Sequence, residues 1–357
     1  LDVTGAVASV GEEIAAALAG FDAREQEALD AALVELDGTR DRSRLGGNAL
    51  IATSMAAAHA AAAADDVPLW RYLGADARAR LPLPEIQIFG GGAHAGRRVD
   101  IQDFMCIAVG AETFSQALAW TADVYRAAGE LLAESGRLHG VADEGGWWPA
   151  FDSNEEGLAL LVRAIERAGL TAGEQMAISL DIAASEFGQD GRYELARDGR
   201  TLETGELIDL LETWLESYPI VSIEDPLAED DADGLRDFTQ RVGKRVQVIG
   251  DDFLVTDCAR VDMAAARGAC NALLVKPNQA GTLSETHAAF DAAAAAGWGT
   301  VVSARSGETE DVTIVHLAVG WGAPQLKVGS LTRGERTAKW NEALRIGETL
   351  ASGDVLP

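Results

Sequence analysis

Cysteine is scarce in this sequence of 357 residues, which contains only Cys106, Cys258 and Cys270. No two of them are spaced as the CxxC pair of a metal or redox motif, and an odd, small number does not predict a disulfide framework. Thiols that stay reduced are typical of proteins of the cytoplasm. We therefore expect a cytoplasmic protein without disulfides.

The sequence also lacks a long uninterrupted apolar run. The nearest approach is the alanine-rich stretch around residue 60, which His59 interrupts and Asp65 ends. Because a membrane-spanning helix needs about 20 apolar residues, we expect no membrane association. No charged segment followed by an apolar stretch opens the sequence, so we expect no export signal.

Basic residues are outnumbered by acidic ones. Lys and Arg together number 29 against 57 Asp and Glu, which gives a formal net charge of −28. A surface of this sign repels the phosphate backbone, so we expect no nucleic-acid partner. The simplest role of the charge is solubility. Part of it can also come from carboxylates gathered around metal ions.

Composition divides the chain into two regions. Residues 1–80 are rich in alanine, and the run Ala49–Ala64 predicts a helix that starts after a turn at residues 46–48 and stops before Pro68. We therefore expect a helical region over residues 1–80 and a second region of different structure over residues 81–357.

From residue 81, short apolar runs alternate with amphipathic stretches such as 155–168, 207–217 and 283–296. This alternation predicts a mostly parallel sheet, and seven or eight such units suit a closed (β/α)8 barrel. The absence of a GxGxxG motif after the first strand counts against an open doubly wound sheet. The predicted strands are Ile86–Phe89, Met105–Val109, Ala177–Ile182, Ile220–Glu224, Val246–Gly250, Ala272–Lys276, Thr300–Ser303 and Gln325–Val328.

Three successive predicted strands end in a carboxylate, namely Asp181, Glu224 and Asp251. In a barrel the carboxyl ends of the strands meet at one mouth, so these side chains should lie together. Carboxylates held close repel one another unless a cation lies among them, and oxygen ligands suit Mg²⁺. The alternative interpretation is that each carboxylate caps the helix that follows it.

Lysines follow at the next strand ends. Lys276 ends one apolar strand, and Lys327 follows Leu326 in the last one. Burial and neighbouring cations lower the pKa of a lysine towards the range of a general base, which is the expectation for Lys276. The alternative is a structural lysine paired with a carboxylate.

Beyond these strand ends, several short motifs resemble those of the enolase family, and the resemblance extends over nearly the whole chain. The motifs are Leu36-Asp37-Gly38-Thr39, Gly91-Gly92-Ala93-His94-Ala95-Gly96, Asp143-Glu144-Gly145-Gly146, Ala184-Ser185-Glu186-Phe187, Ser222-Ile223-Glu224-Asp225, Gly250-Asp251-Asp252, Lys276-Pro277-Asn278-Gln279 and Arg305-Ser306-Gly307-Glu308-Thr309-Glu310-Asp311. Each motif is weak alone, whereas the set is highly specific. The resemblance implies that residues 81–357 form an enolase-type (β/α)8 barrel, the catalytic domain. It also implies that residues 1–80 are the helical remnant of an N-terminal α+β capping domain.

The resemblance also implies a chemistry, the Mg²⁺-dependent interconversion of 2-phosphoglycerate and phosphoenolpyruvate. It implies two Mg²⁺ ions, the second of which binds with the substrate, and a homodimer or higher homo-oligomer. In the family pattern, Asp181, Glu224 and Asp251 would hold the first Mg²⁺. Lys276 would remove the proton from the carbon beside the carboxylate, Glu144 would be the acid that helps hydroxide leave, and Lys327 would stabilise charge on the carboxylate. Arg305 and Ser306 would bind the phosphate, and His94 would line the pocket.

The sequence departs from the family pattern near the expected substrate. Ala304 stands where the family has His, and Asp103 stands where it has Glu, one methylene longer. Trp148 replaces a small residue, whereas Trp147 beside it is a milder change, and we expect this pair to crowd or reshape the pocket entrance. Phe89-Gly90 replaces the usual Ile-Asn before the Gly-Gly-x-His segment. The alternative for these last two departures is neutral repacking.

These departures leave two further functions open. One is an enolase paralogue that acts on a related phosphorus compound, like the carboxyphosphonoenolpyruvate synthase of phosphinate biosynthesis, for which Ala304 leaves room beside the phosphorus. The other is a non-catalytic binding protein with an enolase fold. For the enolase reaction and for that of the paralogue, the expected substrate is a small phosphorylated or phosphonate carboxylate. The Ser-Gly-Ala-Ser-Thr-Gly loop that closes over the substrate in the family is not found in this sequence.

Overall fold

A computed structural model describes residues 2–74, 79–350 and 353–356. Eight strands close into a barrel, in the order β1-β11-β10-β9-β8-β7-β3-β2. All eight predicted strands are present, with ends that shift by a few residues. Their bounds are β1 Leu83–Gly90, β2 Asp103–Ile107, β3 Ala177–Asp181, β7 Ile220–Glu224, β8 Gln247–Gly250, β9 Ala272–Val275, β10 Gly299–Ser303 and β11 Gln325–Gly329.

The first part of the barrel departs from a regular alternation of strand and helix. Strand β2 runs antiparallel to both of its neighbours, β1 and β3, whereas the other pairs are parallel. Between β1 and β2 lies only the 3₁₀ turn η2, Ala93–Ala95. An antiparallel neighbour needs no helical crossover, which explains the short connection. The start of β2 therefore lies at the mouth of the barrel together with the carboxyl ends of the parallel strands.

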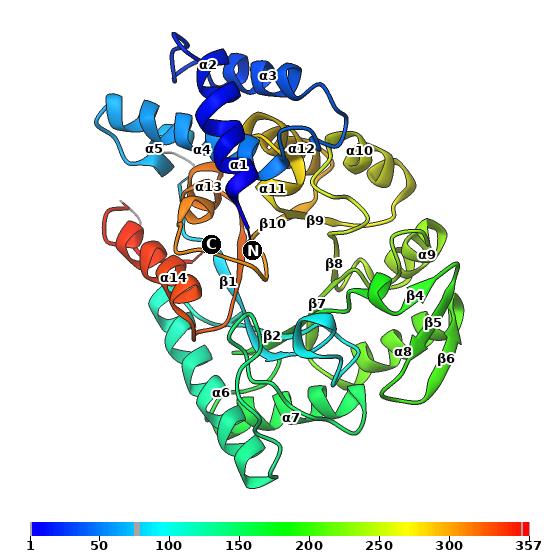
Figure 1. The fold of residues 1–357 in the computed structure, drawn as a ribbon. Coiled ribbons are helices and arrows are strands. Elements are labelled where there is room, and N and C mark those ends of the chain that lie inside the picture. Colours follow the sequence, from blue (N-terminus) through cyan, green and yellow to red (C-terminus); the bar gives the residue numbers. More distant parts are fainter. Residues whose placement is uncertain (1, 75–78, 351–352, 357) are drawn as a thin grey trace.

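Helices surround the barrel (Figure 1). Most follow a strand and pack an apolar face on the sheet; in α9, for example, which follows β7, Leu235, Phe238 and Val242 are fully buried. The bounds are α6 Phe114–Glu134, α7 Asn154–Arg167, α8 Thr204–Ser217, α9 Ala232–Val242, α10 Cys258–Arg267, α11 Pro277–Ala280, α12 Leu283–Ala295, α13 Thr313–Trp321 and α14 Gly334–Gly347. The short turn η3, Ala184–Glu186, follows β3.

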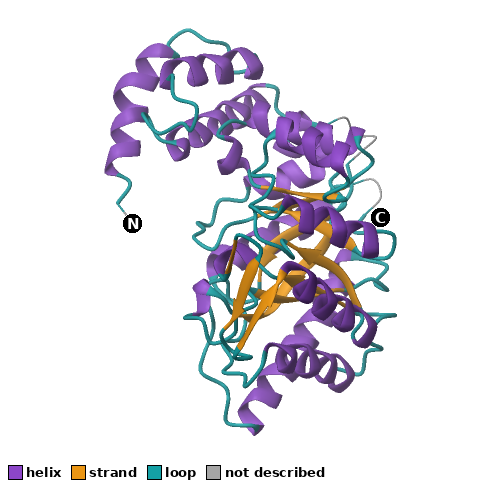
Figure 2. Ribbon diagram, turned by 90° about the vertical axis from the view of Figure 1, so that its right-hand side faces the viewer, coloured by secondary structure: helices purple, strands orange, loops and turns teal. Residues whose placement is uncertain are grey.

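A helical layer covers one side of the barrel (Figure 2). It consists of α1 Thr4–Ser9, η1 Val10–Ile14, α2 Ala15–Ala17, α3 Gln26–Asp37, α4 Gly47–Ala64 and α5 Leu69–Leu73. The expected alanine-rich helix is α4, which begins after Gly46. The φ of Gly46 is 97°, a backbone conformation that glycine adopts readily and other residues rarely do. Residues 75–78, just before the predicted domain boundary at 80/81, lie outside the described residues, and that boundary stays a prediction.

A small antiparallel sheet, which the sequence analysis did not anticipate, follows β3. It is formed by β4 Gly188–Gln189, β5 Arg192–Leu195 and β6 Arg200–Glu203. Its strands are too short to stand out as alternating runs in the sequence. Tyr193 and Leu195 of β5 are fully buried and attach this sheet to the main core.

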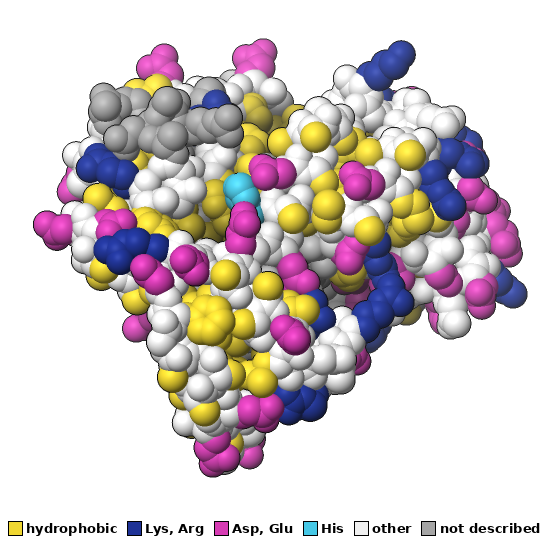
Figure 3. Space-filling view, turned by 90° about the horizontal axis from the view of Figure 1, so that it is seen from above, with side chains coloured by type: hydrophobic (Ala, Val, Ile, Leu, Met, Phe, Trp, Pro, Cys, Tyr) yellow, Lys and Arg dark blue, Asp and Glu magenta, His cyan; other side chains and the backbone are white. Residues whose placement is uncertain are grey.

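The surface carries the charge that the composition predicts. In the view onto the helical layer, acidic and basic side chains are interspersed rather than gathered into one patch (Figure 3). Such mixing is typical of a surface that keeps a protein in solution. Across the described parts of the chain, none of the helices combines the length and apolar character that crossing a membrane requires.

Candidate active site

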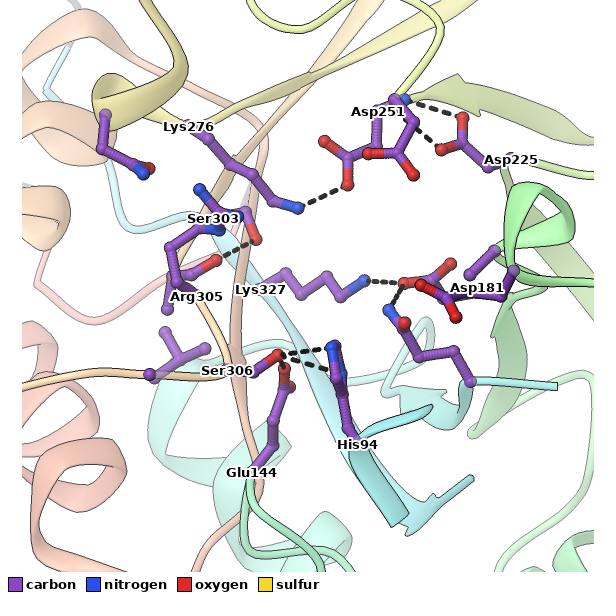
Figure 4. Close-up of a pocket in the computed structure, with 18 residues that line it drawn as sticks. His94, Glu144, Asp181, Asp225, Asp251, Lys276, Ser303, Arg305, Ser306 and Lys327 are labelled. Atoms are coloured by element: carbon purple, nitrogen blue, oxygen red, sulfur yellow. Dashed lines mark hydrogen bonds and ion pairs between the residues drawn. The ribbon is translucent and has the colours of Figure 1, made fainter. Parts of the chain in front are cut away.

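A cavity of about 420 Å³ opens at the mouth of the barrel, where the strand ends converge. It is lined by every predicted site residue except Asp103 and Glu224, which are buried against its floor. The closed barrel therefore brings together side chains that lie more than 230 residues apart in the sequence, from His94 to Lys327. Figure 4 shows how they point toward one another.

Lys327 lies among the carboxylates at the centre of the site. Its Nζ is 2.8 Å from Asp181 Oδ2 and 2.8 Å from Glu224 Oε2, and 3.7 Å from Asp103 Oδ2. Burial lowers the pKa of Lys327, but the surrounding carboxylates outweigh burial and hold this pKa well above its ordinary value. Lys327 is therefore a fixed positive charge in the cavity.

Lys276 reaches the site from the end of β9 and contacts the Asp251 carboxylate (Figure 4). Burial lowers its pKa, yet the charges of Asp251 and Glu224 raise it more, and the net pKa lies above the ordinary value. The expected lowering depended on neighbouring cations as well as on burial, and without a bound cation the pKa of Lys276 is raised instead. The physical reason is that carboxylates, rather than cations, are the nearest neighbours of Lys276.

The carboxylates retain unused oxygens. Glu224 is fully buried, and its Oε1 has no hydrogen-bond partner within the described residues; the same holds for Asp103 Oδ2. A buried oxygen without a partner is costly, and a cation ligand is one way to satisfy it. The donors are all oxygens, which is the set that Mg²⁺ prefers. The predicted ligands Asp181, Glu224 and Asp251 have this chemistry, but in this structure Lys327 lies between Asp181 and Glu224, and the three carboxylates do not form a group with oxygens within 4.8 Å of one another among the described residues.

A second carboxylate group overlaps this set. Asp225, Asp251 and Asp252 place oxygens within 4.8 Å of one another, which makes them a geometric candidate for a metal among the described residues. Asp225, however, already accepts hydrogen bonds from the backbone N–H groups of Asp251 (2.9 Å) and Asp252 (2.8 Å). We therefore interpret Asp225 as the residue that fixes the end of β8 and aims Asp251 into the cavity.

Glu144, His94 and Ser306 meet on the opposite wall of the cavity (Figure 4). The Ser306 hydroxyl lies 2.8 Å from Glu144 Oε1 and 2.9 Å from His94 Nδ1. These three residues come from three separate loops, so only the folded barrel assembles them. The arrangement places a carboxyl group across the cavity from Lys276, as an acid and a base that act on two sides of one substrate require.

The loop that carries Ala304, Arg305 and Ser306 is held from behind by α14. Fully buried Arg336 donates to the carbonyl oxygens of Arg305 (2.7 Å) and Ser306 (2.6 Å). Lys339 donates to Thr309 O at 2.8 Å. Arg305 itself is exposed on the cavity wall, where its guanidinium is free to meet an anion. Ala304 offers only a methyl group there.

Asp103 reaches the site because β2 is antiparallel. It is the first residue of β2 and pairs with Asp181 in the sheet register. Burial, and then the charge of Glu144, hold the pKa of Asp103 well above its ordinary value. The rule that carboxyl ends of strands form the site would have missed this residue, because Asp103 starts a strand.

The two tryptophans do not line the cavity. Trp147 stacks on Tyr125 of helix α6, with ring centroids 4.6 Å apart. Trp148 donates through Nε1 to Ala95 O, and the Arg98 guanidinium lies 3.8 Å from its ring centroid. Neither ring therefore crowds the cavity, and whether the pair reshapes its entrance stays a prediction. Trp148 instead supports the loop that carries His94 from behind.

Other cavity residues were not predicted. Gln102 donates to Asp181 Oδ2 at 2.8 Å, and Asn278, Glu186 and Asp252 also line the cavity. Burial and the charge of Asp251 raise the pKa of Asp252 to about 6. Gln102, Asp252 and Asn278 lie one or two residues from Asp103, Asp251 and Lys276, and this position was the available signal. Glu186 lies in the Ala184-Ser185-Glu186-Phe187 motif. Adjacent residues at a loop often share one cavity, although the pattern alone does not say which ones point inward.

Comparisons with known proteins agree with this geometry. The sequence profile described as "Enolase, C-terminal TIM barrel domain" matches residues 78–356, and the one described as "Enolase, N-terminal domain" matches residues 1–73. Enolase 1 of Desulfitobacterium hafniense (strain Y51) is 48% identical over 358 residues, covering 99% of this chain and 82% of the relative. The enolase of Rubrobacter xylanophilus is 49% identical and covers 99% of this chain and 82% of the relative. The enolase of Tropheryma whipplei strain Twist is 49% identical and covers 98% of this chain and 81% of the relative.

Proposed function

This chain belongs to the enolase family, and on that premise we propose that it is a hydro-lyase that interconverts 2-phosphoglycerate and phosphoenolpyruvate. The observation that carries the proposal is the convergence of Lys276, Lys327 and Glu144 with three metal-type carboxylates in one cavity. A chain without catalysis has no physical need to bury so many like charges together. The barrel builds a site suited to removing a proton next to a carboxylate.

Each side chain has a task that follows from its place. Lys276, in its neutral form, takes the proton from the carbon beside the substrate carboxylate. Lys327 is a fixed cation that stabilises the negative charge that then builds up on that carboxylate. Glu144 gives a proton to the departing hydroxyl from the opposite wall, where Ser306 orients it. Arg305 binds the phosphate.

We assign the Mg²⁺ requirement to Asp181, Glu224 and Asp251, whose oxygen-only chemistry fits this ion. When bound, Mg²⁺ supplies positive charge that offsets these carboxylates and stabilises the doubly charged carboxylate of the intermediate. Offsetting Asp251 and Glu224 also removes the interactions that raise the Lys276 pKa. A second ion that binds with the substrate remains part of the proposal.

The relatives bear on the alternatives. Identities of 48–49% over nearly the whole chain to proteins named enolase favour the hydratase over a phosphonate-type paralogue or a non-catalytic binding protein. The Ala304 methyl group remains the feature by which the substrate pocket differs from the family pattern. A cytoplasmic homodimer or higher homo-oligomer stays a proposal that rests on the three free cysteines and on the family resemblance.

The experiment that tests the function is the formation of phosphoenolpyruvate from 2-phosphoglycerate, followed by absorbance with and without Mg²⁺. We expect turnover that requires Mg²⁺ and that falls by about 10²–10⁴-fold in Lys276→Ala, the range for losing a general base. Lys244→Ala, an exposed lysine, is the matched control and should keep the parental rate.

Two results would contradict the proposal. Mg²⁺ binding, measured by calorimetry, without turnover of 2-phosphoglycerate would favour a different phosphorus-containing substrate. Absence of both Mg²⁺ binding and turnover would favour a binding protein with an enolase fold.

A further inference from the structure

Gln87 lies in the middle of β1, and its side chain crosses from that strand to two functional segments. Only 2% of Gln87 is exposed. Its amide Nε2 donates to Asp103 Oδ1, and its Oε1 accepts the backbone N–H of Gly146 at 2.8 Å. One neutral side chain therefore connects Asp103 with the turn that carries Glu144.

We propose that Gln87 is a positioning residue that fixes the spacing between Asp103 and Glu144 for the reaction. The inference rests on the proposed function for its catalytic meaning. Its structural content, that Gln87 holds the 144–146 turn and the Asp103 carboxylate in place, rests on the contacts alone.

The 144–146 turn is held from several sides. Ser330 N donates to Glu144 O at 2.8 Å, and Gly145 O accepts from the hydroxyls of Tyr125 (3.0 Å) and Thr332 (2.5 Å). These contacts hold the outer side of the turn. The hydrogen bond from Gly146 N to Gln87 adds a tie from inside the barrel, next to the site.

Two glycines, Gly146 and Gly90, lie beside the long Gln87 side chain. A Cβ added to Gly146 would lie 2.9 Å from Gln87 Cδ, and one added to Gly90 would lie 3.3 Å from Gln87 Nε2 and 2.6 Å from Ala142 Cβ. The contacts at 2.9 Å and 2.6 Å cannot be accommodated without movement, so Gly146 makes room for the Gln87 amide, whereas Gly90 makes room chiefly for Ala142. Gly90 is one of the departures from the family pattern.

The bridge also accounts for the short carboxylate at Asp103. The resemblance predicts Glu at this position, and Asp ends one methylene earlier. The Gln87 amide reaches across from the neighbouring antiparallel strand and holds Asp103 Oδ1, while Asp103 Oδ2 faces Lys327 at 3.7 Å. A displacement of about 1 Å can cost about 10²-fold in rate, so the bridge matters for catalysis more than for stability.

The test compares Gln87→Met with Gln247→Met in the full-length protein. Met matches the length of Gln but makes no amide hydrogen bonds. Gln247 is a suitable control because it also bridges two side chains inside the barrel: it accepts from Ser222 and donates to Gln325, below the site. Gln87→Met should lower kcat by about 10²-fold with KM within about threefold of the parent.

Gln247→Met should keep the parental kcat, even if its melting temperature falls as much as that of Gln87→Met. Equal loss of kcat in the two variants would overturn the inference, because it would show a general effect of losing a buried bridge. Parental kcat in Gln87→Met would also overturn it. If Gln87→Met does not fold, Gln87→Asn keeps a neutral amide but is one methylene shorter, so it cannot reach Asp103 and Gly146 together, and the same loss of kcat is expected.

Crystal structures of the parent and the two variants separate this inference from the proposed function. Gln87→Met should displace Gly146 and the Glu144 carboxylate relative to Ser306, whereas Gln247→Met should not. If the parent shows no turnover, the proposed function fails, and the structures still decide whether Gln87 holds the turn. A 144–146 turn that stays in place in Gln87→Met would refute the inference.

Discussion

Buried polar side chains are satisfied differently at the mouth of the barrel and in the interior layer below it. Below the site, neutral side chains satisfy one another: Ser222 Oγ donates to Gln247 Oε1 at 3.0 Å, and Gln247 Nε2 donates to Gln325 Oε1 at 2.7 Å. At the mouth, charged groups crowd together, and Glu224 Oε1 and Asp103 Oδ2 lack hydrogen-bond partners within the described residues. Incompletely satisfied charge therefore marks the functional end of the barrel.

Glu85 is the exception in the lower layer. It is fully buried, its Oε1 accepts from Ser179 Oγ, and its Oε2 lacks a partner within the described residues. Burial outweighs the attraction of Lys327 and raises the Glu85 pKa. The comparison between the two layers can be tested by removing one charge or one hydrogen bond from each.

The largest effect is expected for Lys327→Met at the mouth. This change leaves Asp181 and Glu224 buried without their cation, so the free energy of unfolding should fall by about 3–5 kcal/mol in Mg²⁺-free buffer. Because a divalent cation compensates the same carboxylates, Mg²⁺ should restore part of the stability but not the turnover. Urea denaturation and the absorbance assay measure the two quantities.

The exposed Lys244→Met is the control for Lys327→Met and should be close to the parent in both measurements. A Lys327→Met protein as stable as the parent without Mg²⁺ would show that the carboxylates at the mouth do not depend on Lys327 for compensation.

Glu85→Gln should have an intermediate effect of opposite sign. A carboxyl group whose pKa is raised in the folded state favours its protonated form, so the stability of the parent falls as pH rises from the ordinary glutamate pKa through the raised one. At pH 7.5, Glu85→Gln should therefore raise the free energy of unfolding by about 1–3 kcal/mol, the penalty of an unsatisfied buried group. The gain should shrink toward pH 4.5.

Denaturation of the parent and Glu85→Gln at the two pH values measures this difference. If the substitution destabilises the protein at pH 7.5, the attraction between Glu85 and Lys327 is worth more than the cost of burial, and the two layers are electrostatically one unit.

The smallest effect is expected for Ser222→Ala in the neutral layer. It removes one hydrogen bond to Gln247 and should lower the free energy of unfolding by about 0.5–1.5 kcal/mol. Turnover should stay at the parental value, because Ser222 does not line the cavity. A large loss of turnover would show that the lower layer takes part in shaping the site.

Much of the barrel could be predicted from the sequence, because each strand is a local apolar run. All eight strands were predicted, and Asp181, Glu224 and Asp251 were placed at one mouth by the rule for parallel strand ends. The antiparallel direction of β2 was not predicted, because direction depends on which edges pair and not on local pattern. Asp103 was found through the family resemblance alone.

The pKa of Lys276 and the position of Trp148 show the other limit. Both depend on neighbours that are distant in the sequence: Glu224 and Asp251 for Lys276, and Ala95 and Arg98 for Trp148. The identity of a residue does not reveal which charges or backbone groups surround it after folding.

By itself, the sequence determined the elements of this protein and the chemical types that end its strands, since apolar periodicity and residue identity are local properties. Only the tertiary structure decided how these groups act together. Lys327 lies among the carboxylates of three other strands, and Gln87 joins Asp103 to the Glu144 turn. Closure of the barrel is the physical reason, because it brings distant strand ends to within hydrogen-bonding distance at one mouth.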